Sequence, residues 1–234
     1  MMAFQSLILV LGFLLGLALK FAMTASEPLW SDSWLGRGPW FAVSGGAMLA
    51  MVMFAGVWLL SQRGWAWLTE IQQILDQVLI PSLRKCRYWQ LLVLAMLAGI
   101  GEELLFRWAM QGWFELGLRG LFDSPMSLGL APSPTERWAF AGAILLTSIV
   151  FGLCHAITRA YCALATMMGL VFSGVVVCGG GLVGAMIAHG LYDFLAFVWL
   201  CRRAGDLANA DLSNANLSNA NLSTAGAESE FRAG

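Results

Sequence analysis

The chain has 234 residues, of which 59% are hydrophobic and 12% are charged, whereas about a quarter of the residues of a typical soluble domain carry a charge. Its mean hydropathy of +0.73, with only 13 basic and 14 acidic residues, excludes an ordinary soluble globular protein and a disordered chain. The net charge of −1 gives no electrostatic reason to expect a nucleic-acid partner. Most of the chain is therefore expected to lie in membrane lipid.

Six apolar runs are long enough to cross a membrane as helices, which takes about 20 residues each. They cover residues 3–19, 41–60, 88–108 with an extension to 118, 138–157, 161–178 and 182–200. Three consecutive glycines at 179–181 separate the last two runs by supplying a tight turn. The first run lacks a basic leader and a clear cleavage site, which favours a retained helix over a signal peptide. The sequence therefore predicts an all-α polytopic transmembrane helix bundle with about six spans.

Residues 65–80, between the second and third runs, follow a different pattern. Trp65, Leu68, Ile71 and Val78 recur at helical spacing, with polar residues between them. Two interpretations fit this amphipathic helix: it lies along the membrane interface, or it connects two spans and packs on them.

Basic residues in the short loops indicate the orientation of the bundle, because cytoplasmic loops carry an excess of Lys and Arg. One side has seven such residues, namely Arg63, Arg84, Lys85, Arg87, Arg159, Arg202 and Arg203. The other side has four, namely Lys20, Arg37, Arg119 and Arg137. Both termini are therefore predicted to be cytoplasmic.

A polar tail of residues 204–234 follows the membrane domain of residues 1–203. Leu207, Leu212, Leu217 and Leu222 recur every five residues, and from Ala210 the chain reads ADLSN-ANLSN-ANLST. This tail resembles the pentapeptide repeat, whose family fold is a right-handed β-helix. Because four repeats make about one coil and a solenoid needs several stacked repeats, we expect a flexible or partly ordered tail, with a small docking module as the alternative.

Five ionisable side chains lie inside the apolar runs, on three different predicted helices: Glu102, Glu103, His155, His189 and Asp193. A charged side chain at such a depth costs at least about 2.5–3.5 kcal/mol on insertion scales, so residues of this kind are rare and usually functional. We therefore expect these side chains to share one polar cavity within the bundle.

The first helix of this set carries a carboxyl pair with two different roles. Glu103 and Arg107 are four residues apart in the order that favours an ion pair, so both are expected to be mainly structural. Glu102 lies about 100° further round the helix and can face elsewhere. In a desolvated position it is suited to act as a general base near neutral pH.

The other two helices repeat the four-residue spacing. His189 and Asp193 share one helical face, and Phe151 shares a face with His155, which places an aromatic ring beside the second histidine. One carboxyl group and two histidines from three helices favour a catalytic site. Two alternatives remain open at this point: a proton- or ion-coupled transporter, and a non-catalytic scaffold whose polar cluster locks the helices together.

Three short motifs in a fixed order carry a family resemblance. Residues 102–107 match E-E-x-x-x-R, residues 151–155 match F-x-x-x-H, and residues 189–193 match H-x-x-x-N/D. Their order and separation resemble the CPBP family of intramembrane proteases, which includes the eukaryotic CAAX prenyl endopeptidases. The resemblance covers the protease-like core at residues 88–200.

The resemblance implies an intramembrane endopeptidase that hydrolyses a peptide bond in a membrane-associated peptide or protein. Glu102 would activate the water, His155 would help to hold it, and His189 with Asp193 would stabilise the oxyanion, while Glu103, Arg107 and Phe151 would support them. The last motif position is often Asn in the family. An Asp there must be protonated, or balanced by an imidazolium at His189, to serve as a donor.

Metal dependence is the point on which the sequence offers two answers. Glu102, His155 and His189 are candidate ligands for a divalent zinc ion, which would lower the pKa of its bound water. The chain has no H-E-x-x-H motif, and we favour a metal-independent glutamate mechanism with no committed cofactor. Membrane lipid and a peptide or membrane-protein substrate are the expected partners. The compact form and the repeat-like tail suggest a bacterial inner (plasma) membrane.

Overall fold

The computed structural model describes residues 8, 10–18, 32–121 and 134–233, and its description of side chains ends at residue 209. All regular elements in this part are helices, and it contains no strand. Residues 10–18 are helical, and the later elements follow in the order α2 Asp32–Leu35, α3 Pro39–Ser61, α4 Ala66–Val78, α5 Ile80–Leu83, α6 Tyr88–Glu103, the π-helix η1 Leu104–Met110, α7 Gln111–Leu121, α8 Pro134–Cys154, α9 Arg159–Val175, the π-helix η2 Val176–Gly180 and α10 Gly181–Ala233.

Four stretches are long and apolar enough to cross a membrane, judged by length and composition: Pro39–Ser61, Tyr88–Leu121, Pro134–Cys154 and Arg159–Leu207. The last one reverses direction at Gly179 and so contains both helices predicted for residues 161–178 and 182–200. Residues 3–7, 9 and 19 of the first predicted span lie outside the described residues. The predicted all-α membrane helix bundle is confirmed.

The turn between α9 and α10 depends on its glycines. Gly179 and Gly181 have φ angles of 95° and 64°, which side chains rarely allow. The Gly179 carbonyl accepts a 2.7 Å hydrogen bond from the backbone N–H of Arg37. A Cβ atom on Gly181 would lie only 2.5 Å from the backbone nitrogen of Gly36. The glycine run therefore allows the turn to pack closely against the link between α2 and α3.

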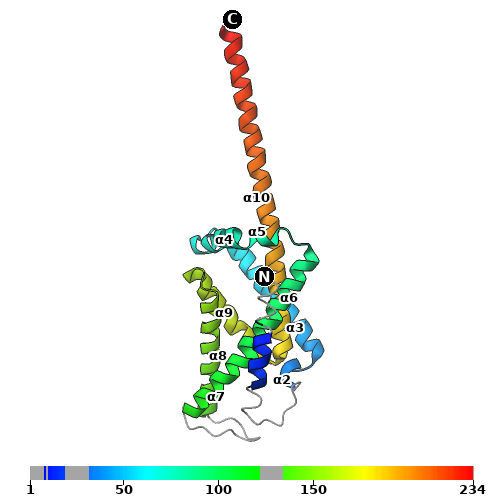
Figure 1. Ribbon diagram of the computed structural model, residues 1–234, viewed down its shortest axis with the longest axis vertical. Helices are drawn as coiled ribbons and strands as arrows, with labels where there is room; N and C mark the ends of the chain where they lie inside the picture. Colours follow the sequence, from blue (N-terminus) through cyan, green and yellow to red (C-terminus); the bar gives the residue numbers. More distant parts are fainter. Residues whose placement is uncertain (1–7, 9, 19–31, 122–133, 234) are drawn as a thin grey trace.

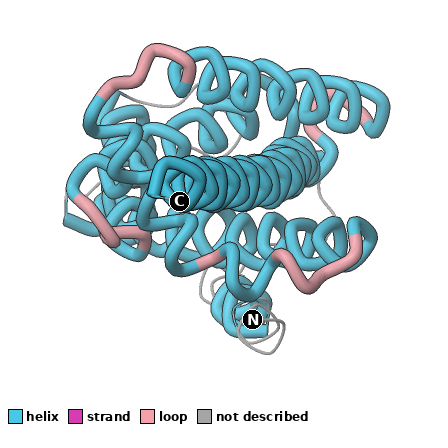
Figure 2. The backbone as a smooth tube through the Cα atoms, turned by 90° about the horizontal axis from the view of Figure 1, so that it is seen from above, coloured by secondary structure: helices cyan, strands magenta, loops and turns pink. Residues whose placement is uncertain are grey.

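Helix α10 runs through the centre of the bundle and packs against α6 and α3 (Figures 1 and 2). The backbones of α6 and α10 come very close at one point, where a Cβ atom on Gly99 would lie 2.6 Å from the nitrogen of Gly190. Glu102 and Glu103 are one turn beyond Gly99, and His189 directly precedes Gly190. This close approach brings the glutamates of α6 beside the histidine of α10.

Helix α4 lies across one end of the bundle (Figure 1). Its apolar face is buried through Leu68 and Ile71 and packs on α3 and α9, while Trp67 is exposed. An ion pair between Asp76 and Arg203 ties α4 to α10. The structure describes packing of this amphipathic segment on the spans, and its location at the membrane interface stays a prediction.

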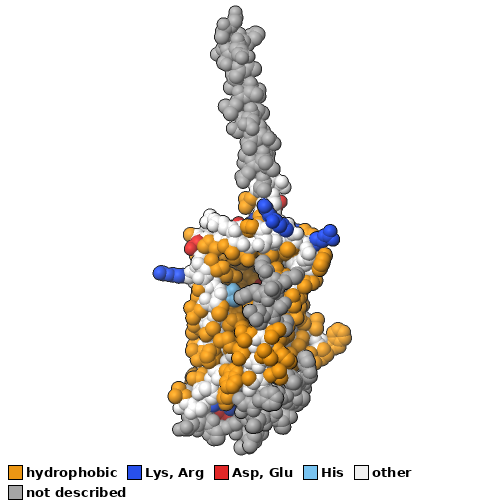
Figure 3. Space-filling view, in the orientation of Figure 1, with side chains coloured by type: hydrophobic (Ala, Val, Ile, Leu, Met, Phe, Trp, Pro, Cys, Tyr) orange, Lys and Arg blue, Asp and Glu red, His pale blue; other side chains and the backbone are white. Residues whose placement is uncertain are grey.

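Basic side chains gather at the end of the bundle where α10 leaves it, and apolar side chains cover most of the face below (Figure 3). The end of α3, α5, the start of α9 and residues 202–203 meet at this end, whereas α2, the end of α7 and the start of α8 lie at the opposite end (Figure 1). The described basic residues therefore fall at two opposite ends of the bundle, in the same two groups that the loops of the sequence predict. The cytoplasmic location of the basic-rich end stays a prediction.

The tail has a helical backbone, and its predicted flexibility stays a prediction. The backbone of α10 is helical as far as Ala233, so residues 204–233 form neither a coil of β-helix nor an irregular segment. Ala and Leu, two strong helix formers, recur in every five-residue unit. Extending the existing helix α10 into these units avoids the cost of nucleating a new helix. The division into domains at residue 204 stays a prediction.

Candidate active site

The structure brings together all four side chains that the sequence assigns to catalysis. Oε2 of Glu102 lies 3.8 Å from Nε2 of His155 and 3.8 Å from Nε2 of His189. Nε2 of His189 lies 3.6 Å from Oδ2 of Asp193. Glu102 comes from the end of α6, His155 follows the last residue of α8, and the other two lie on α10. These four side chains therefore form one polar cluster between three helices.

Glu103 connects two parts of this cluster. Its Oε1 atom lies 3.1 Å from Nη1 of Arg107 and 2.8 Å from Nδ1 of His189, and the side chain is fully buried. The ion pair with Arg107 is the one that the four-residue spacing predicts. Because a carboxylate paired with a guanidinium acts as an acceptor, Nδ1 of His189 is the donor to Glu103. Glu103 thus orients a histidine in addition to its structural pairing.

Arg107 is held on several sides within the bundle. It lies in the π-helix η1, a kind of element that is common at functional sites. Its Nη2 donates a 3.1 Å hydrogen bond to the carbonyl of Gly169 on α9. The guanidinium carbon lies 4.6 Å and 5.4 Å from the ring centres of Phe151 and Phe172. A carboxylate, a carbonyl and two aromatic faces together offset the cost of burying this charge.

The proton position on His155 follows from its neighbour. Nδ1 of His155 lies 2.7 Å from the carbonyl oxygen of Phe151. Because a carbonyl can only accept, Nδ1 must carry a proton, and the neutral ring then presents the lone pair of Nε2 toward Glu102. The ring of Phe151 lies 4.5 Å from the imidazole, centre to centre, as the F-x-x-x-H spacing predicts.

Helix α9 contributes a wall of the site that the sequence reasoning did not include. The ring of Phe172 stacks on the imidazole of His189, with centres 4.6 Å apart and planes at 12°. One residue further on, the hydroxyl of Ser173 donates to Oε1 of Gln111 at 3.3 Å. No motif or charge singles out these positions, since an aromatic residue in an apolar run is normally lipid-facing or core.

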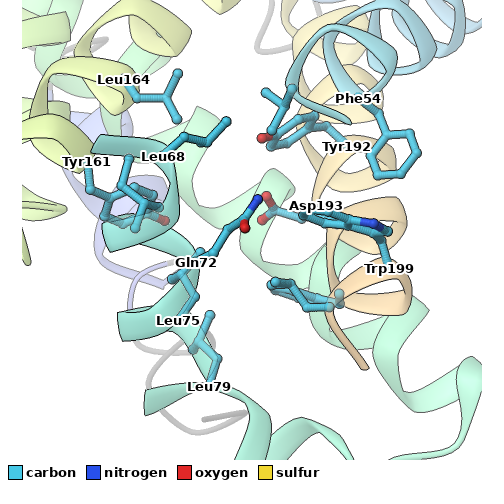
Figure 4. Close-up of a pocket in the computed structure, with 15 residues that line it drawn as sticks. Phe54, Leu68, Gln72, Leu75, Leu79, Tyr161, Leu164, Tyr192, Asp193 and Trp199 are labelled. Atoms are coloured by element: carbon cyan, nitrogen blue, oxygen red, sulfur yellow. The ribbon is translucent and has the colours of Figure 1, made fainter. Parts of the chain in front are cut away.

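The polar cluster opens into a cavity of about 260 Å³. Its walls are mostly apolar and include Leu75, Leu79, Leu94, Met168 and Phe197, and its polar end is formed by Glu102, His155, His189 and Asp193. A smaller cavity of about 80 Å³ shares Asp193 and Tyr192 with it and reaches under α4. In this second cavity Gln72 of α4 points toward Asp193 (Figure 4).

Residues 85–195 match the family model described as "Type II CAAX prenyl endopeptidase Rce1-like". The match supports the resemblance of this core of the chain to the CAAX protease family. The family that the three motifs resemble is thereby confirmed, and the matched region contains all four clustered side chains. No curated protein and no solved structure matches the chain.

The likeness to the CAAX protease family, together with the apolar helices, supports a general description of the protein. The apolar helices support an integral membrane protein. The family match supports a protease, whose substrates are peptides or proteins.

The nitrogen and oxygen atoms around Glu102 are the candidate ligands for a zinc ion in this core. Within the part of the chain that the structure describes, no three His, Cys, Asp or Glu side chains are placed to hold one metal ion. Nδ1 of each histidine is already bonded to an oxygen atom of the protein, which leaves only the two Nε2 atoms as nitrogen donors near Glu102. A hydrogen bond at Nδ1 is common for zinc-bound histidines, and two Nε2 atoms with one carboxylate are donor types of a catalytic zinc site. The disagreement with a zinc site therefore lies in the placement of these side chains and not in their chemistry.

Proposed function

We propose that the protein is an intramembrane endopeptidase that hydrolyses a peptide bond with a water molecule activated at Glu102 and His155. One observation carries this proposal: Nε2 atoms of two histidines from different helices both face the same Glu102 oxygen at 3.8 Å. That separation is too long for a direct hydrogen bond. Each of the two gaps between Glu102 and a histidine is short enough for one water to bridge it.

The two nearest acceptors would orient this water. Its hydrogens would point at the Glu102 carboxylate and at the lone pair of His155 Nε2, which leaves an oxygen lone pair free to attack a carbonyl carbon. Glu102 would take the proton as the new bond forms and would pass it to the leaving amine. The mostly apolar walls of the cavity limit the number of water molecules that surround this carboxylate.

His189 and Asp193 would stabilise the oxyanion of the tetrahedral intermediate. With Nδ1 bonded to Glu103, His189 has Nε2 available to donate when the ring is an imidazolium, and Glu102, Glu103 and Asp193 surround it with balancing charge. Asp193 would donate a hydrogen bond to the oxyanion in its protonated form. It stands at the position where the family that this core resembles often has Asn.

Cleavage of a fluorogenic membrane peptide by purified protein in lipid vesicles tests the proposal. Glu102→Gln is expected to lower kcat at least a thousandfold while thermal unfolding stays near that of the wild type, because the amide cannot accept the proton. Glu115→Gln is the matched control on α7, with the same chemical change on a residue that pairs with Arg119 away from the cavity. This variant should cleave as the wild type does.

The result that would contradict the proposal is equal turnover by wild type and Glu102→Gln. A strong chelator, added in a parallel reaction, separates the two water-activation mechanisms: unchanged cleavage supports the glutamate mechanism, and loss that zinc restores supports a metal. An inactive wild type whose Glu102→Gln variant shows only altered thermal stability would favour the scaffold alternative.

A further inference from the structure

The geometry points to Phe172 as a positioning residue that fixes the imidazole of His189 for catalysis. This inference rests on the proposed function, because it assigns His189 the oxyanion role. It adds a residue from α9, a helix that carries none of the three motifs that place residues in the site. Phe172 would act through His189 and would form no bond with the reacting atoms.

The contact between the two rings is close and nearly parallel. Phe172 is 1% exposed, and its ring lies 4.6 Å from the imidazole centre with an interplanar angle of 12°. Phe151 meets the same imidazole at 5.9 Å and 74°, an edge-on contact. The stacked ring restrains the tilt of the imidazole, and the edge-on ring restrains it from another direction.

His189 needs this restraint because its hydrogen bond at Nδ1 resists tilting of the ring only weakly. The bond from Nδ1 to Glu103 holds one side of the ring, but rotation about the Cβ–Cγ bond is soft for an imidazole and displaces Nδ1 and Nε2 together. Such a rotation moves Nε2 away from Glu102 and Asp193, which lie 3.8 Å and 3.6 Å from it. A displacement of about 1 Å at a reacting group can cost a hundredfold in rate.

Phe172 also stands beside the charge that holds Glu103 in place. The guanidinium carbon of Arg107 lies 5.4 Å from the Phe172 ring centre, and the same guanidinium donates to Gly169, one turn earlier on α9. Helix α9 therefore restrains both His189 and Arg107, the residue that pairs with the Glu103 carboxylate. Simple filling of space would require only an apolar side chain of similar volume.

The test compares Phe172→Leu, Phe172→Tyr and a packing control in the vesicle cleavage assay. Phe172→Leu keeps an apolar side chain without a ring and is expected to lower kcat about 10- to 100-fold with KM within a factor of two. Phe172→Tyr keeps the ring and should restore kcat to within a few fold. Leu91→Ala removes a side chain that is 2% exposed and does not line the cavity, so it should lower the unfolding temperature with little change in kcat.

Three results would overturn the inference: wild-type kcat in Phe172→Leu, a raised KM with unchanged kcat, or equal kcat losses in Phe172→Leu and Leu91→Ala. The second result would mean that Phe172 contacts substrate instead. Glu102→Gln, measured in the same series, separates this failure from that of the proposed function. An inactive Glu102→Gln with a fully active Phe172→Leu contradicts only the role of Phe172.

Discussion

Two Glu-x-x-x-Arg pairs lie on the same continuous stretch of helix and have different surroundings. The Glu103–Arg107 pair has side chains 0% and 1% exposed, and its carboxylate also binds His189. The Glu115–Arg119 pair has side chains 23% and 19% exposed, and its guanidinium also binds Glu136 at the start of α8. Identical spacing therefore produces a component of the site in one turn and a link between two helices in another.

The difference shows that spacing decides which side chains pair, whereas the neighbouring helices decide what the pair does. At Glu103 the neighbours are a histidine of α10 and the aromatic wall of α9, so the carboxylate orients a potential catalyst. At Glu115 the neighbour is another carboxylate, and the resulting cluster joins α7 to α8. Substitutions at the two pairs should separate these roles.

The largest effect is expected for Glu103→Gln. This change leaves the buried Arg107 charge without its counter-ion, and breaking a buried pair in this way costs about 3–5 kcal/mol. The same change weakens the hydrogen bond that orients His189, so cleavage should also fall at least a hundredfold. Denaturant unfolding in micelles measures the first effect and the vesicle assay measures the second. Wild-type stability in this variant would contradict the description of the pair as buried and coupled.

The double variant Glu103→Leu with Arg107→Met separates stability from orientation. Replacing a buried pair by apolar side chains of similar volume is often neutral for stability, so the double variant should regain about 2 kcal/mol relative to Glu103→Gln. Its cleavage activity should stay at least a hundredfold below wild type, because His189 still lacks its acceptor. Recovery of both properties together would show that Glu103 serves the fold alone.

Asp193→Asn should have a smaller effect. An amide can donate a hydrogen bond to the oxyanion without a proton from solution, so kcat is expected to stay within about tenfold of wild type. Asp193→Leu removes the donor and should lower kcat by about a hundredfold. If the Asn and Leu variants lose equal activity, a negative charge at this position is required, and the proposed donor role is wrong.

The smallest effect belongs to Glu115→Gln. The pair is partly exposed, and Arg119 keeps Glu136 as a partner, so the loss of stability should be about 0–1 kcal/mol. Unfolding at low and high salt checks this value, since salt screens exposed pairs more than buried ones. A loss as large as that of Glu103→Gln would remove the distinction between the two pairs.

Local spacing was enough to predict several features of this protein. The pairing of Glu103 with Arg107, the contact of Phe151 with His155 and the turn at residues 179–181 all follow from positions within a few residues of one another. Apolar run lengths predicted the all-α membrane bundle, because a helix must match the thickness of the lipid. Such features depend on the geometry of a single helix or turn, which the sequence contains directly.

Contacts between helices could not be predicted from the sequence, for a physical reason. The bonds from Arg107 to Gly169 and from His189 to Glu103 join residues 62 and 86 positions apart. Periodicity shows which residues share a face, but in a bundle surrounded by lipid it does not show how each helix is rotated against its neighbours. The sequence analysis missed the stacking of Phe172 and the π-helix at Arg107 for this reason. It missed the helical backbone of the tail because the continuation of α10 outweighs the repeat pattern.

Cleavage in water enriched in the heavy oxygen isotope tests the central claim most directly. Hydrolysis by an activated water must place one heavy oxygen atom in the new carboxyl group of the product, which mass spectrometry detects. The wild type and Glu115→Gln should both yield labelled product, and Glu102→Gln should yield none above the uncatalysed background. Labelled product formed equally fast by Glu102→Gln would contradict the assignment of Glu102 as the base that activates water.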